Sequence, residues 1–142
     1  MHIRQLFGRK LAFAARQWRA VMNERLLPFG LTEATWLPML YISREKPMRQ
    51  KDLAEVLGVE SSSLVRVIDA LVAAGLVVRK VEEDRRARVI ALTPEGCELI
   101  AKVESISLEV SDQTLESISD EALASASEVI DQISASLARQ RG

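Results

Sequence analysis

LVVRKVEEDRRARVIAL, residues 76–92, is the stretch that decides the fold of this 142-residue chain. Two short runs rich in β-branched residues, 76–81 and 88–92, enclose a charged segment in which three acids are followed by arginines. Short runs of this composition on either side of a polar segment predict a β-hairpin. A charge run between apolar stretches is most often a solvated loop, so the role of this one depends on its neighbours in the chain.

Two helical patterns come directly before the hairpin. The first, QKDLAEVLGV at residues 50–59, is ended by Gly58, and the second, ESSSLVRVIDALVAAGL at residues 60–76, is closed by Gly75. The predicted core face of the second helix consists of Leu64, Ile68, Leu71 and Val72. The opposite face presents Ser62, Arg66, Asp69 and Ala73. The order of short helix, turn, amphipathic helix and hairpin predicts a winged helix-turn-helix, in which the hairpin is the wing.

Longer helical patterns flank this segment. We expect a first helix from about Ile3 to Leu27, stopped by Pro28. A second helix should follow the N-cap Thr32 and kink at Pro38. After the hairpin, we expect one helix opened by Thr93-Pro94 and a last one after Asp120. The predicted fold class is therefore mainly α with a small β-hairpin wing.

The flanking helices suggest a homodimer. Their apolar faces are long and lie outside the compact middle segment, so they have to pack on each other, and a symmetric partner would bury what remains. The alternative is a monomer with an intramolecular three-helix cap. We predict a first dimerisation helix and linker at 1–31, a winged helix-turn-helix DNA-binding domain at 32–92, and C-terminal dimerisation helices at 93–142.

Composition restricts the class of protein. The net charge is −1, but residues 1–43 carry +4, residues 44–92 carry +2, residues 93–138 carry −9 and the tail adds +2 with Arg139 and Arg141. Nucleic acid would therefore be repelled by the C-terminal segment and tolerated or attracted by the rest. One cysteine and one histidine exclude a disulfide scaffold and argue against a metal site. We expect a cytoplasmic protein, since a reducing compartment fits best and no apolar run is long enough for a membrane span.

The start of the helix predicted at residues 60–76 suits the major groove of double-stranded DNA. Ser61, Ser62 and Ser63 are small polar residues that let the backbone approach phosphates. One turn later, Arg66 is long enough to reach guanine O6 and N7. The alternative for Arg66 is a surface ion pair with Asp69, three residues on.

The wing tip suits the minor groove, whose negative potential favours arginine on a slim hairpin. Arg85 and Arg86 lie at this tip, and Arg88 follows at the start of the returning strand. We expect Asp84 to pair with Arg79 or Arg86 and so to fix the shape of the tip.

The segment GLVVRKVEEDRRARVIALTPEG resembles the wing signature of the MarR family of bacterial transcriptional regulators, with its G-L-x-x-R strand, D-R-R-A tip and L-T-x-x-G end. Three further segments resemble the SlyA-like branch: RQWRAVMNERLLPFGLT, LTEATW and KDLAEVLGVESSSLVRVIDAL. The resemblance implies a homodimer, a pseudo-palindromic operator, repressor-type DNA binding and, often, release by small aromatic or phenolic acids. It assigns Arg66 to the major groove and Arg86, with Arg85, to the minor groove.

A ligand cavity is expected between the dimerisation helices and the DNA-binding lobe. Its expected lining is Arg16, Trp18, Thr32, Trp36 and Met39. Arg16 would suit a carboxylate, and the tryptophans would suit an aromatic ring. The alternative is that both tryptophans belong to the core. Where SlyA-like members commonly carry a histidine before the matching tryptophan, this chain has Thr35.

Cys97 is the other candidate for a residue through which the protein could sense a signal. Redox-sensing relatives carry a cysteine on or near the first helix, which this chain lacks, so a structural role is favoured and a redox-responsive regulator is the alternative.

For catalysis we find no paired nucleophile and base, no glycine-rich phosphate loop and no cofactor motif. We therefore predict no enzyme, no catalytic residue and no cofactor. The other alternative is a winged-helix protein–protein interaction module, which would not need arginines on both the helix and the wing.

Overall fold

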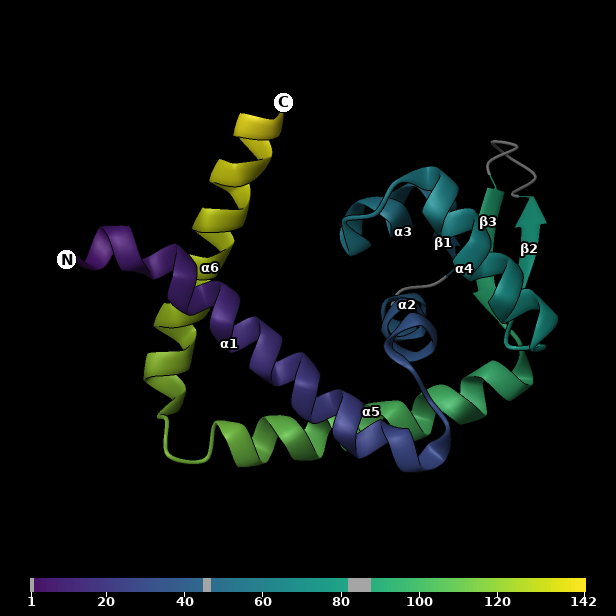
Figure 1. Cartoon of the computed structure of the whole chain (residues 1–142), viewed down its shortest axis with the longest axis horizontal. Helices are drawn as coiled ribbons and strands as arrows, with labels where there is room; N and C mark the ends of the chain where they lie inside the picture. The colour runs from purple at the N-terminus through teal and green to yellow at the C-terminus, as the bar shows by residue number, and fades with distance from the viewer. Residues whose placement is uncertain (1, 45–46, 82–87) are drawn as a thin grey trace. The chain divides into compact units, whose positions relative to one another are not determined.

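The computed structural model describes residues 2–44, 47–81 and 88–142 (Figure 1). Six α-helices, one 3-10 helix and three strands are present in these residues. In chain order the elements are α1 (Ile3–Leu26), η1 (Leu27–Phe29), α2 (Glu33–Arg44), β1 (Met48–Arg49), α3 (Gln50–Leu57), α4 (Ser61–Ala73), β2 (Val77–Val81), β3 (Arg88–Leu92), α5 (Pro94–Thr114) and α6 (Asp120–Arg141). The structure is thus mainly helical with a small antiparallel sheet, as predicted.

Helix α1 begins and ends close to the expected positions. His2 caps its first turn, and the Gln5 side chain accepts a hydrogen bond from the His2 backbone in return. Pro28 lies in η1, and Gly30 then takes a φ of +73°, a left-handed conformation that glycine adopts without strain. The turn redirects the chain into α2, which continues as a helix through Pro38.

The sheet has one strand more than the sequence predicts. Strand order is β1-β3-β2, and both pairs are antiparallel. Strand β1 has only two residues, Met48 and Arg49, which pair with Ile90 and Val89 of β3. The predicted two-stranded wing is therefore the outer part of a three-stranded sheet, and β1 ties the start of α3 to the wing.

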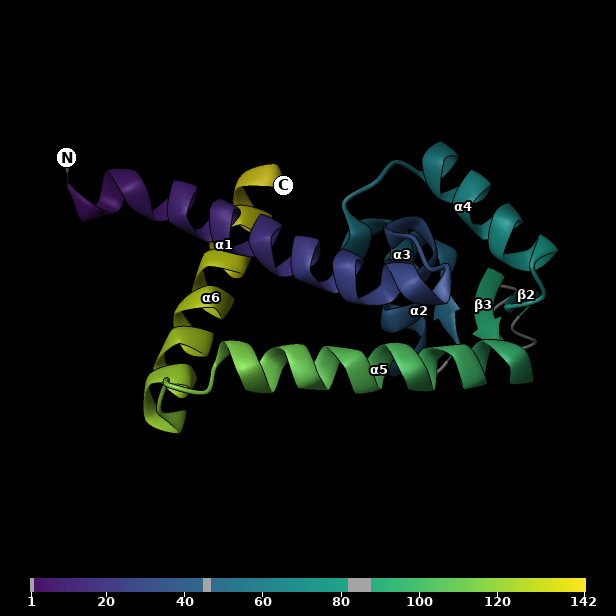
Figure 2. The same ribbon diagram turned by 60° about the horizontal axis from the view of Figure 1, so that its bottom comes forward.

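The helix-turn-helix lobe packs around one apolar core. Helices α2, α3 and α4 cover the sheet, with α4 lying beside β2 (Figures 1 and 2). The most completely buried side chains of this core come from α2, α3, α4 and β3. They are Met39, Leu53, Leu64, Ile68 and Ile90. Three of the four residues predicted for the core face of α4 are buried, but Val72 is 38% exposed because it lies at the edge of that stripe.

The start of α5 is fixed against the turn after α4. Thr93 Oγ1 accepts a hydrogen bond from the Gly96 backbone at 3.0 Å and donates one to the Gly75 carbonyl at 2.6 Å. A Cβ on Gly96 would stand well under 3.0 Å from the Leu76 carbonyl oxygen. The Thr-Pro-Glu-Gly segment therefore combines a helix cap with a close backbone approach that only glycine permits.

Contacts divide the chain into two compact units, residues 1–108 and residues 109–142. In the first unit, the N-terminal half of α1 keeps apolar side chains exposed, among them Ile3 and Phe7, while Met22 and Leu26 at its other end are buried. In the second unit, α6 has no buried residue within the single chain. Both long helices thus carry apolar surface that one copy of the chain leaves open.

Candidate nucleic-acid interface

Helix α4 presents the predicted polar face to solvent. Ser61, Ser62, Ser63 and Arg66 are all exposed, opposite the buried stripe of Leu64, Ile68 and Leu71. The serines do not cap the helix. The N-cap is Glu60, whose side chain makes no capping bond, and the three serines form the first turn itself. Their small side chains therefore surround backbone N–H groups that have no partner within the helix.

Arg66 is available for an external partner. Its suggested partner Asp69 is bound by Arg79 instead, with Arg79 Nη2 at 2.6 Å from Asp69 Oδ1. Within the described part of the chain, Arg66 itself has no ion pair. The guanidinium that projects from the second turn of α4 thus keeps its donors for another molecule.

The Asp69–Arg79 pair joins the predicted recognition helix to the wing. Asp69 lies on α4 and Arg79 on β2, so the contact crosses from helix to sheet. We expected Arg79 to support the wing through Asp84, but Asp84 lies outside the described residues. The partner that the structure shows for Arg79 is Asp69 of α4.

The strands of the wing are regular up to its tip. Pairing runs from Val77 opposite Leu92 to Val81 opposite Arg88. Arg88 is exposed at the start of β3. The remaining wing candidates, Arg85 and Arg86, lie outside the described residues together with Asp84.

Sequence reasoning missed two cations of this surface. Arg49 and Lys51, at the start of α3, line the same pocket as Ser61 and Arg88. No local pattern marks them, because the pocket forms only when β1 pairs with β3.

The five ligand candidates fall into different environments. Trp36 and Met39 are buried in the core, as in the alternative considered for the tryptophans, whereas Trp18 is half-buried. Thr32 is exposed, with its hydroxyl 3.4 Å from that of Thr35. Arg16 lies exposed on α1 over the Phe13 ring, 5.9 Å from the ring centre.

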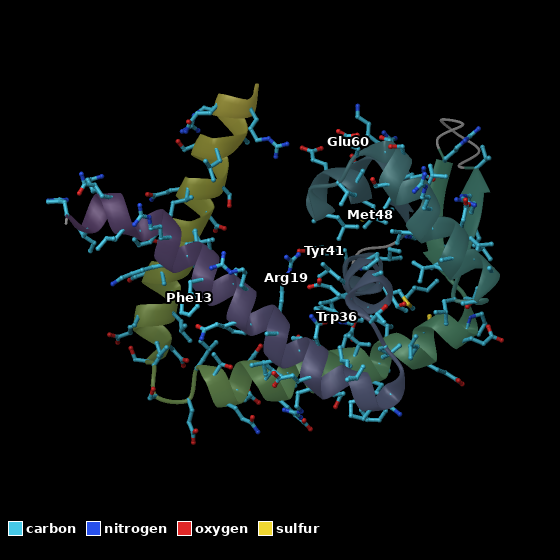
Figure 3. All side chains as sticks on the ribbon, in the orientation of Figure 1. Phe13, Arg19, Trp36, Tyr41, Met48 and Glu60 are labelled. Atoms are coloured by element: carbon cyan, nitrogen blue, oxygen red, sulfur yellow. The ribbon has the colours of Figure 1, made fainter. Side chains whose placement is uncertain are left out.

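Polar contacts between α1 and α2 involve other residues. Trp36 Nε1 donates to Asn23 Oδ1 at 2.9 Å, and Arg19 Nε lies 3.3 Å from Glu33 Oε1. Figure 3 shows Arg19 extending from α1 toward α2. Glu33 Oε1 is buried and has no hydrogen bond in the described structure, so the charge of Arg19 is its compensation. This joint, which the sequence did not reveal, connects the long first helix to the helix-turn-helix lobe.

Other kinds of site find no support in the described residues. They contain no group of His, Cys, Asp and Glu side chains that could hold a metal ion. Cys97 is an exposed free thiol in the first turn of α5. Among the helices described, none combines the length and the hydropathy needed to cross a membrane.

The arrangement of α3, α4 and a three-stranded sheet with its wing is that of a winged-helix transcriptional regulator. A family model described as MarR family matches residues 29–87. The crystal structure of transcriptional regulator PA3341 is 40% identical in sequence and superposes with a TM-score of 0.88, covering 94% of this chain and 98% of that one. The chain belongs to the MarR family of transcriptional regulators.

Two more distant structures share the fold. A MarR family regulator from Listeria monocytogenes, complexed with 26mer DNA, has a TM-score of 0.83 at 15% identity, covering 93% of this chain and 89% of its own. CouR from Rhodococcus jostii RHA1, bound to p-coumaroyl-CoA, has a TM-score of 0.77 at 23% identity, covering 89% of this chain and 90% of its own. At these identities the likeness concerns the fold.

Proposed function

We propose that this regulator binds a pseudo-palindromic operator as a homodimer, with α4 in the major groove and the wing in the minor groove. The observation that carries this proposal is the exposed face of α4, where small serines precede an arginine that has no ion pair in the described structure. Arg66 would donate to guanine, and the serines would allow the backbone to approach phosphate. Arg85 and Arg86 of the wing tip would contribute the minor-groove contact.

The homodimer is supported by the apolar surface that one chain leaves open. Ile130 of α6 is 45% exposed and Leu137 is 52% exposed, and Ile3 and Phe7 of α1 are exposed as well. Large apolar side chains left exposed on each of these helices are typical of interaction surfaces. In this proposal residues 1–31 and 93–142 make the dimer, and residues 32–92 bind DNA. Two recognition helices would then lie about one duplex turn apart, ~34–36 Å.

We propose further that a small aromatic or phenolic acid modulates DNA binding, as the family resemblance implies. Support comes from the joint between α1 and α2, where Trp36, Asn23, Arg19 and Glu33 meet. A ligand that altered this joint would change the link between the dimer helices and the DNA-binding lobe. Arg16, Trp18 and Thr32 remain candidates for contacts with such a ligand.

Footprinting tests the proposal. The protein is added to genomic fragments, beginning with DNA upstream of its own gene, at fixed salt. We expect a protected pseudo-palindrome, and we expect Arg66→Ala to lose discrimination among operators more than general affinity. Absence of any protected site would refute operator binding, and an equal loss on all sequences would assign Arg66 to phosphate. Protection lost on adding a phenolic acid would support the ligand.

A further inference from the structure

A concave pocket lies where the recognition helix, α3 and the wing meet. Its volume is about 390 Å³, and its described lining consists of Arg49, Gln50, Lys51, Ser61 and Arg88. The three cations come from β1, α3 and β3, and the serine is the first residue of α4. No carboxylate lines the pocket among the described residues, although Asp52 and Glu60 are close in sequence.

Strand pairing holds this pocket together. Arg49 pairs with Val89, so Arg88 is next to the strand partner of Arg49. Arg49 is also the N-cap residue of α3, and Lys51 is in the first turn of that helix. The cations are therefore placed by backbone hydrogen bonds of the sheet and the helix, and not only by flexible side chains.

The electrostatics of the pocket favour an anion. Arg49, Lys51 and Arg88 bring three positive charges to the lining, and Lys51 and Arg88 form no ion pair with any described residue. The N-terminal turns of α3 and α4 add partial positive charge, and no side chain caps either helix. An anion with several acceptor oxygens would pair with Lys51 and Arg88 and accept from the backbone donors of the helix N-termini.

We propose that this pocket is a phosphate-binding site, and that a backbone phosphate of duplex DNA occupies it. This inference rests on the proposed function and adds residues to it. The site lies between the first turn of α4 and the start of β3. A duplex that has α4 in its major groove and the wing in its minor groove has to pass a sugar-phosphate strand between these two elements. The contact fixes register and orientation and carries no base information.

The test measures how DNA affinity depends on salt. Fluorescence anisotropy gives the affinity of wild type, Lys51→Gln, Arg88→Gln and the double variant for an operator duplex and for a scrambled duplex. Because one phosphate occupies each pocket and the proposed homodimer has two pockets, loss of the site in the double variant should lower the slope of log affinity against log salt by about 1.8, and each single variant should lower it by part of that amount. The loss should be equal on both duplexes. Lys10→Gln is the matched control, since Lys10 is an exposed lysine of α1 outside the pocket, and its slope should equal that of wild type.

Circular dichroism and thermal melting confirm that the variants are folded. A double variant that keeps the wild-type slope overturns the phosphate site while the proposed function stands. A wild-type protein that binds no duplex overturns the proposed function and DNA as the occupant.

A second arm separates backbone phosphate from free phosphate. Pyrophosphate is titrated into the DNA-free protein by calorimetry. Tight binding that is lost in the double variant would show that the pocket takes a free phosphoryl ligand, which overturns DNA as its specific occupant. Weak or undetectable binding, together with the reduced slope, supports the backbone phosphate.

Discussion

The ion pair between Asp69 and Arg79 should make a measurable contribution to stability, and its size can be worked from the structure. Arg79 Nη2 and Asp69 Oδ1 are 2.6 Å apart, with 37% and 59% of the side chains exposed, respectively. Two unit charges at that separation attract by about 1.6 kcal/mol in a water-like dielectric. Ordering two flexible side chains offsets part of this attraction, so we expect a coupling of about 0.5–1 kcal/mol.

A double-mutant cycle measures this coupling. Urea unfolding at one protein concentration is compared for wild type, Asp69→Ala, Arg79→Ala and the double variant, and the coupling should shrink at ~1 M salt because the pair is exposed. The control cycle combines Asp69→Ala with Lys80→Ala in place of Arg79→Ala. Lys80 is the next residue of β2 and points to the opposite face of the sheet. A coupling under about 0.2 kcal/mol at low salt, or one equal to that of the Lys80 cycle, would refute the contribution of the pair.

The same variants test whether the pair orients the wing for DNA. If the side chains acted only through their charge, Asp69→Ala would strengthen binding and Arg79→Ala would weaken it. If the pair sets the wing relative to α4, both substitutions should weaken operator binding, although they change the net charge in opposite directions. Tighter binding by Asp69→Ala would therefore refute the orienting role.

Three other measurements check separate parts of the structure. Arg86→Ala should weaken operator binding by ~1–3 kcal/mol in a fluorescence titration at fixed salt and leave the melting temperature unchanged; equal affinity would contradict the minor-groove contact. Gly96→Ala should lower the free energy of unfolding by about 1–3 kcal/mol, because its methyl group would overlap the Leu76 carbonyl; a variant as stable as wild type would show that α5 shifts easily. Sedimentation at micromolar concentration should give the mass of a dimer, and Ile130→Glu with Leu137→Glu should shift it toward the monomer; a wild-type monomer would contradict the two-half-site proposal.

Helix ends were predictable because their signals are local. Gly58 and Gly75 end α3 and α4 in left-handed conformations, with φ of +68° and +76°. Thr93 caps α5 directly before Pro94. Each signal acts within one turn of its own residue, so it can be recognised without knowledge of the tertiary structure.

Strand β1 was missed for the opposite reason. Two residues are too few to show an alternating pattern, and Met48 and Arg49 become a strand only because Ile90 and Val89 offer their backbone groups. The pocket of Arg49, Lys51 and Arg88 follows from the same long-range pairing. The partner of Asp69 was missed too, since Arg79 reaches it from the next element whereas sequence spacing pointed to Arg66.

Periodicity identified apolar faces but not what covers them. In α1 apolar residues recur at helical spacing, among them Ile3, Phe7, Trp18 and Met22. Of these four, only Met22 is buried in the single chain. The pattern is a property of the helix, whereas burial also depends on neighbours that the pattern does not contain. The open part of this face is the part for which we propose a second copy of the chain.

The register of the wing connects stability to DNA binding. Because opposite residues of an antiparallel pair point to the same face, Val77, Arg79, Ile90 and Arg88 share one face of the sheet. Val77 is buried at the base of the hairpin, and Ile90 is buried directly opposite Arg79 in the middle of the strand pair. Arg79 makes the ion pair with α4, and Arg88, at the far end of the pair, lines the cationic pocket. A slip of one residue would move a whole strand's set of side chains to the other face. The apolar residues that fix the register therefore also determine where both arginines lie, so a substitution at Ile90 that permits slippage would reduce DNA affinity without touching a DNA contact.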